Sequence, residues 1–99
     1  MSLPKKNIRQ LKSLAHHLKP IVILGKSGLS DAVLHEIDIA LAHHELIKVK
    51  VNADDREALH LIAEQITRQT SADLVQVIGH TVVLYRPAKK PVIHLGDPD

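Results

Sequence analysis

The feature that most narrows the possible folds is a regular alternation of helix-like and strand-like segments along 99 residues. Apolar side chains at helical spacing predict three helices, over residues 4–18, 30–44 and 54–70. Runs rich in β-branched residues predict four short strands, over 20–24, 46–51, 74–78 and 81–86. A helix that joins two strands favours a right-handed crossover and parallel strands. We therefore predict an α/β (mixed α+β) fold, with the order α-β-α-β-α-β-β and a mixed four-stranded sheet packed against helices.

The length and composition allow one compact domain. Hydrophobic residues make up 44% of the chain and charged residues 24%, which is typical of a globular protein. From Pro87 onward the chain contains three prolines and ends in GDPD. We therefore predict a folded domain over residues 1–86 and a loosely ordered tail over 87–99.

The sequence argues against several locations and chemistries. No apolar run approaches the roughly 20 residues that span a bilayer, and the first residues contain no apolar core of a secretory signal. We expect a cytoplasmic protein with no membrane partner. Cysteine is absent, which excludes a disulfide framework, a thiolate zinc site and a cysteine nucleophile.

The net charge of +2 hides an uneven distribution. Residues 1–28 carry six lysines and arginines and no acidic residue, whereas residues 29–99 carry seven basic and eleven acidic residues. Lys5, Arg9 and Lys12 recur at helical spacing beside the apolar stripe of the first helix. This pattern fits a surface that binds a polyanion, although a solubilising helix would look the same.

The segment PIVILGKSGLSDAV places a glycine loop between a strand and a helix, whose N-cap we predict to be Ser30. A phosphate-binding Walker loop would need a glycine where Pro20 stands, and the spacing fits neither a dinucleotide fingerprint nor a nucleophile elbow. The remaining pattern, GxxG over residues 25–28, can bring a nucleic-acid backbone close to the chain, as in KH domains. A plain tight turn is the alternative for this segment.

No catalytic or metal site can be identified. The eight histidines include two adjacent pairs, His16-His17 and His43-His44, which diverge on a helix instead of chelating a metal. No nucleophile and base occur in a recognisable arrangement, and Asp54 and Glu57 resemble a capping box. We expect no enzyme activity, cofactor, metal or small-molecule substrate. The single aromatic residue, Tyr85, argues against modules that stack bases on aromatic rings.

Three stretches together resemble one family: LKSLAHHLKPIVILGKSGLS, HELIKVKV and IGHTVVLYR. They are similar to the CRM domain (chloroplast RNA splicing and ribosome maturation) in its stand-alone bacterial form. The resemblance implies a fold similar to the C-terminal domain of translation initiation factor three. It also implies binding to structured RNA, namely ribosomal RNA in precursors of the large ribosomal subunit, and a role in ribosome assembly.

The candidate contacts follow from the loop and the charge pattern. Gly25 and Gly28 would admit the RNA backbone, while Lys26 and Ser27 would contact phosphate. The first helix would extend the contact through Lys5, Arg9, Lys12 and Lys19. Second-tier candidates are Lys48, Lys50 and Arg86. Two alternatives remain open: a protein-interaction module whose basic face binds an acidic partner, and a nucleotide- or phosphate-binding component of an enzyme.

Overall fold

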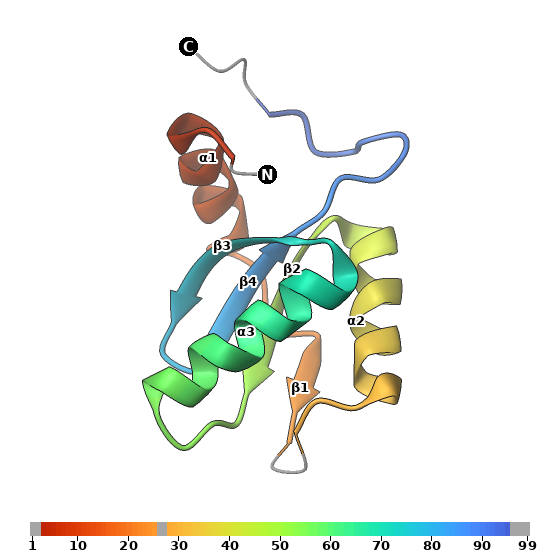
Figure 1. The fold of residues 1–99 in the computed structure, drawn as a ribbon. Helices are drawn as coiled ribbons and strands as arrows, with labels where there is room; N and C mark the ends of the chain where they lie inside the picture. Colours follow the sequence, from red (N-terminus) through yellow and green to blue (C-terminus); the bar gives the residue numbers. More distant parts are fainter. Residues whose placement is uncertain (1–2, 26–27, 96–99) are drawn as a thin grey trace.

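The structure is a computed structural model that describes residues 3–25 and 28–95. It contains three helices and four strands in the predicted order (Figure 1). The elements are α1 (Lys5–Ala15), β1 (Val22–Leu24), α2 (Asp31–His44), β2 (Leu46–Val51), α3 (Arg56–Thr70), β3 (Asp73–Ile78) and β4 (Thr81–Tyr85). The predicted mixed four-stranded sheet and single compact domain are confirmed. No helix of the described residues is long and apolar enough to cross a bilayer.

The strands lie in the order β1-β2-β4-β3. β1 and β2 are parallel, as expected for strands joined by a helix, and β4 is antiparallel to both of its neighbours. The hairpin between β3 and β4 has a two-residue turn at Gly79 and His80, and Gly79 adopts a positive φ of 56°. The last strand in the sequence therefore lies inside the sheet, between β2 and β3.

Helices cover the two faces of the sheet unequally. α2 and α3 pack on one face over the larger core, which includes Leu24, Ile37 and Leu84. α1 packs on the opposite face over a smaller core around Leu11 and Val83. Successive side chains of β2 point to opposite faces of the sheet. Ile47, Val49 and Val51 are buried on the face that α2 and α3 cover. The other face of β2 carries Leu46 under α1, and then Lys48 and Lys50.

Two helix boundaries differ from the prediction. The N-cap of α3 is Asp55, whose Oδ1 accepts a hydrogen bond of 2.8 Å from the Ala58 N–H, so the capping box predicted at Asp54 and Glu57 is wrong by one residue. α1 ends at Ala15 instead of residue 18, because the chain turns there to reach β1. The predicted cap of α2 is confirmed: the Ser30 hydroxyl accepts from the Val33 N–H at 3.2 Å.

The segment after β4 contacts the α1 side of the domain. The Glu45 side chain is buried, and its carboxylate accepts hydrogen bonds of 2.7–2.8 Å from the backbone N–H groups of Ala88, Val92 and Ile93. Burial alone would raise the pKa of this carboxyl, but the three hydrogen bonds outweigh burial and lower its pKa. The prediction of a loosely ordered tail did not anticipate these contacts, because they join residues more than 40 positions apart.

Candidate nucleic-acid interface

One side of α1 presents a row of cationic side chains. Lys5, Arg9 and Lys12 are exposed and line one shallow groove together with Ile8. Leu11 and Ala15 lie on the buried side of the same helix, so the amphipathic pattern fixes which side faces outward. Within the described residues none of these three cations forms an ion pair. Their charge is therefore available to an external anion.

A second groove lies between α1 and the sheet. It is lined from one side by Lys12, Ser13, Ala15, His16 and His17, and from the other by Lys48, Gln76 and Ile78. The Lys48 ammonium donates a hydrogen bond of 3.0 Å to the backbone oxygen of Leu18, in the turn that follows α1. This contact uses one of the three ammonium donors and holds the charge beside the groove. The groove thus joins the cations of α1 to those of β2.

Gly25, the first residue of the glycine loop, lies beside a third groove at the far end of β2. Lys50 and Gly25 both line this groove, together with Ile23, Asn52 and His80. The Gly28 N–H donates to the Gly25 oxygen at 3.1 Å, and Gly28 has a φ of 83°, which strains any residue that carries a Cβ. Apart from each glycine and its chain neighbours, no heavy atom of the described residues lies within 4 Å of the position that a Cβ would take at Gly25 or Gly28. A ligand can therefore approach the backbone closely. Lys26 and Ser27, the predicted phosphate contacts, lie outside the described residues.

Lys19 lines none of these three grooves. It lines a separate and largely apolar groove with Leu14, Leu18, Ile21 and His44.

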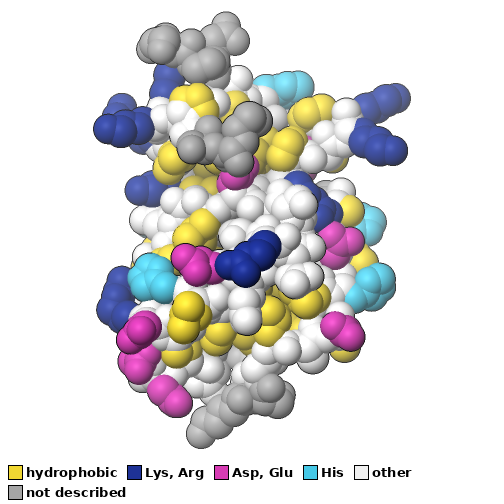
Figure 2. Space-filling model, in the orientation of Figure 1, with side chains coloured by type: hydrophobic (Ala, Val, Ile, Leu, Met, Phe, Trp, Pro, Cys, Tyr) yellow, Lys and Arg dark blue, Asp and Glu magenta, His cyan; other side chains and the backbone are white. Residues whose placement is uncertain are grey.

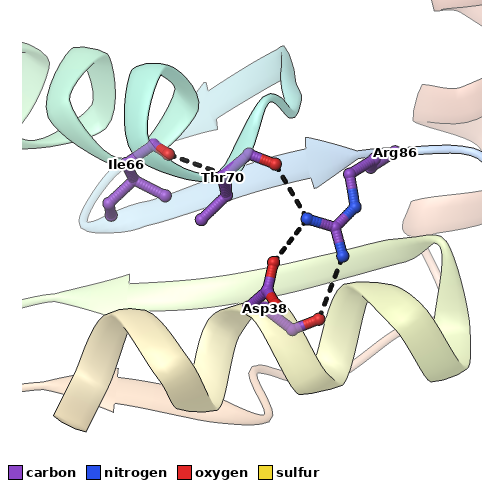
Figure 3. A network of polar contacts seen from close by, with 4 residues as sticks. All are labelled: Asp38, Ile66, Thr70 and Arg86. Carbon is purple, nitrogen blue, oxygen red and sulfur yellow. Dashed lines mark hydrogen bonds and ion pairs between the residues drawn. The ribbon is translucent and has the colours of Figure 1, made fainter. Parts of the chain in front are cut away.

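Arg86 lies on the opposite face of the sheet, in an internal network (Figure 3). Its Nη1 contacts the Asp38 Oδ1 at 2.6 Å and donates to the Thr70 oxygen at 2.8 Å, while Nη2 donates to the Asp38 backbone oxygen at 3.1 Å. These contacts join the end of β4 to α2 and α3. The charge of this guanidinium is therefore compensated within the fold.

The acidic residues that the structure describes do not line the three grooves. Figure 2 shows Lys and Arg side chains over α1 at the upper left and a group of acidic side chains at the lower left, over the start of α3. No Asp or Glu lines any of the three grooves in the part of the chain that the structure describes. We use the name basic track for the surface formed by Lys5, Arg9, Lys12, Lys48, Lys50 and the two described glycines of the loop, Gly25 and Gly28.

The sequence analysis missed several side chains of these grooves, among them His80 and Gln76. His80 reaches the third groove from the hairpin turn, where histidine is an unusual residue and could have attracted attention. Gln76 reaches the second groove from β3, and no local signal in the sequence marks it. Among residues 3–25 and 28–95, no three His, Asp or Glu side chains are grouped so that they could hold a metal ion.

Comparisons with known proteins agree on one family. A model described as the CRS1 / YhbY (CRM) domain matches residues 3–86. A Haemophilus influenzae protein named "RNA-binding protein" is 54% identical over 94 residues, which are 95% of each chain. A Pseudomonas aeruginosa protein named "Probable RNA-binding protein" is 41% identical over 97 residues, which are 98% of this chain and 93% of that one.

A solved structure extends the likeness to three dimensions. The solution structure of a Staphylococcus aureus protein, described as a candidate RNA binding protein, matches this chain with a TM-score of 0.84 and 38% identity. The match covers 96% of this chain and 100% of that one.

Proposed function

The chain belongs to the CRS1 / YhbY (CRM) domain family, and from this membership we propose that it binds structured RNA through the basic track. The names of the relatives state RNA binding for those proteins. In this chain, the observation that carries the proposal is a set of three basic grooves that no described carboxylate lines. The first two grooves share Lys12, and Lys48 of the second and Lys50 of the third lie on the same face of β2.

The chemistry of the track suits phosphate. Lysine and arginine side chains that neutralise phosphates release counterions, and this term supplies most of the non-specific affinity for nucleic acids. Gly25 and Gly28 leave room for the sugar-phosphate backbone, and the N-terminus of α2 adds partial positive charge behind them. Contacts of this kind recognise the shape of an RNA more than its sequence.

The proposal keeps most of the residues that the sequence indicated. Lys26 and Ser27 stay in it as phosphate contacts, and Lys19 stays as a cation that flanks the track. We no longer propose Arg86 as an RNA contact, because its guanidinium already binds Asp38 and Thr70 on the other face of the sheet. We further propose that the RNA is ribosomal and that the protein acts in the cytoplasm on precursors of the large subunit, without catalysis.

A titration of the intact chain with a fluorescent RNA hairpin at several salt concentrations tests RNA binding. Affinity should fall steeply as salt rises, and Lys12→Ala should reduce the slope of log K against log salt by about one. Lys89→Ala, on the exposed segment after β4, is the matched control and should leave the slope unchanged. An unaltered slope for Lys12→Ala would remove this lysine from the interface.

Sedimentation of tagged protein from a cell lysate tests the ribosomal part. Migration with particles near the large subunit, lost as salt rises, would support it. Protein that stays at the top of the gradient at every salt concentration would contradict it. Binding to an acidic protein without affinity for the hairpin would instead favour a protein-interaction module.

A further inference from the structure

Gln76 lies on β3, the outer strand, and lines the groove between α1 and the sheet together with Lys12 and Ser13. Its amide makes no hydrogen bond within the described residues. A side-chain amide offers two donors and an acceptor side by side, whereas a phosphate needs donors alone. This group is therefore suited to a ligand that carries both kinds of partner.

An irregularity in the sheet directs Gln76 into the groove. Leu74 pairs with Leu84, but Gln76 pairs with Val83, so Val75 is an extra residue in β3. Regular alternation would direct Val75 and Gln76 to opposite faces of the sheet. Instead Val75 is buried in the core under α1, and Gln76 lines the groove on that same face. β-bulges recur where a strand must re-aim a side chain near a functional site.

The groove also has the volume, the positive charge and the apolar surface that suit a bound nucleotide. Its volume is about 380 Å³, which lies within the range of small-molecule pockets. Lys12 and Lys48 stand at its sides and can contact phosphates. Ile78 offers an apolar surface against which the flat face of a base can pack.

We propose that this groove receives one unpaired nucleotide of the bound RNA, with the Gln76 amide hydrogen-bonded to the edge of its base. The inference rests on the proposed function and adds a base-reading position to a track that otherwise contacts phosphate. Unpaired nucleotides are the part of a structured RNA whose base edges are accessible to protein side chains. A glutamine amide forms two hydrogen bonds with adenine, so adenine is the base that fits best.

Four RNA hairpins that differ only in the identity of one bulged nucleotide, and a fifth without the bulge, test the proposal. The intact chain should bind the hairpin with the bulged adenosine at least fivefold more tightly than the fully paired one. Gln76→Leu should bring these two affinities within twofold of each other while leaving affinity for the paired hairpin unchanged. Gln65→Leu, on the exposed surface of α3, is the matched control and should keep the preference. Gln76→Ala repeats the test should the bulky leucine disturb β3.

The outcomes separate this inference from the proposed function. Equal binding of all five hairpins by the unaltered chain, or a preference that survives in folded Gln76→Leu and Gln76→Ala variants, would overturn the nucleotide site and leave the phosphate track intact. Failure to bind any of the hairpins would overturn both.

Discussion

The two faces of the sheet differ in whether their cationic side chains are paired with acidic residues of the described chain. On the face under α2 and α3, apolar side chains fill the interface, and Arg86, which lies on that side, is paired with Asp38. On the other face, α1 covers only one end of the strands, and Lys48 and Lys50 border open grooves without an acidic partner among the described residues. The comparison teaches that one face stabilises the domain, while the other holds charge that the fold itself does not neutralise.

The largest effect should come from the covered face. Ile37 of α2 is fully buried in the larger core, so Ile37→Ala should lower the free energy of unfolding by about 2–5 kcal/mol. Denaturant unfolding measures this loss, and RNA affinity at low denaturant should be unchanged. Leu61→Ala on α3, where the side chain is 57% exposed, should cost far less. A large loss of affinity in folded Ile37→Ala would show that the two faces are not independent.

At the glycine loop we expect a large loss of RNA affinity and only a small loss of stability. Gly28→Asp places a carboxylate where we propose that phosphate lies, so RNA affinity should fall roughly tenfold or more. Stability should fall by only about 1–2 kcal/mol, because the residue must keep a positive φ. Gly28→Asn has a similar backbone cost without the charge, so it separates strain from repulsion. Unchanged affinity in folded Gly28→Asp would show that the loop does not contact RNA.

Removal of the paired arginine sharpens the contrast between cations on the two faces. Arg86→Ala should lower stability by roughly 1–2 kcal/mol, because it removes charge-assisted hydrogen bonds to Asp38 and Thr70. The half-exposed ion pair itself adds little to this loss. The salt dependence of RNA binding should be unchanged. A smaller slope of log K against log salt for Arg86→Ala would show that Arg86 contacts RNA.

The smallest expected effect concerns the tail and pH. The pKa of Glu45 is lowered in the folded chain, so the ionised carboxylate stabilises the fold fully at pH values above 4.5, its ordinary pKa. This contribution to stability is lost as the pH falls through the lowered pKa. Glu45→Gln should therefore flatten the dependence of stability on pH in that acidic range. Hydrogen exchange at the amides of Ala88, Val92 and Ile93 should become faster in this variant. Glu36→Gln, exposed on α2, should alter neither measurement.

Local patterns in the sequence were sufficient for the elements and for much of the track. The alternation in residues 46–51 predicted that Lys48 and Lys50 share a face, and Ser30 marked the start of α2. Both features depend on residues a few positions apart. The glycine pattern placed a loop between β1 and α2, and the structure confirms that position.

The parts that could not be predicted depend on contacts between distant segments. The placement of Arg86 beside Asp38 depends on how β4 meets α2, 48 positions earlier in the chain. The position of Gln76 depends on a bulge that is defined only relative to β4. No local pattern marks Glu45 as buried, and its carboxylate is engaged by backbone N–H groups more than 40 positions later in the chain.

The position of β4 has a consequence for synthesis of the chain on the ribosome. β4 is translated after β3, yet in the sheet that the structure describes it is the strand that joins β3 to β2. A nascent chain that ends before residue 81 can pair β1 with β2 but cannot attach β3. The wall that Gln76 and Ile78 give to the groove therefore forms only after β4 has left the exit tunnel.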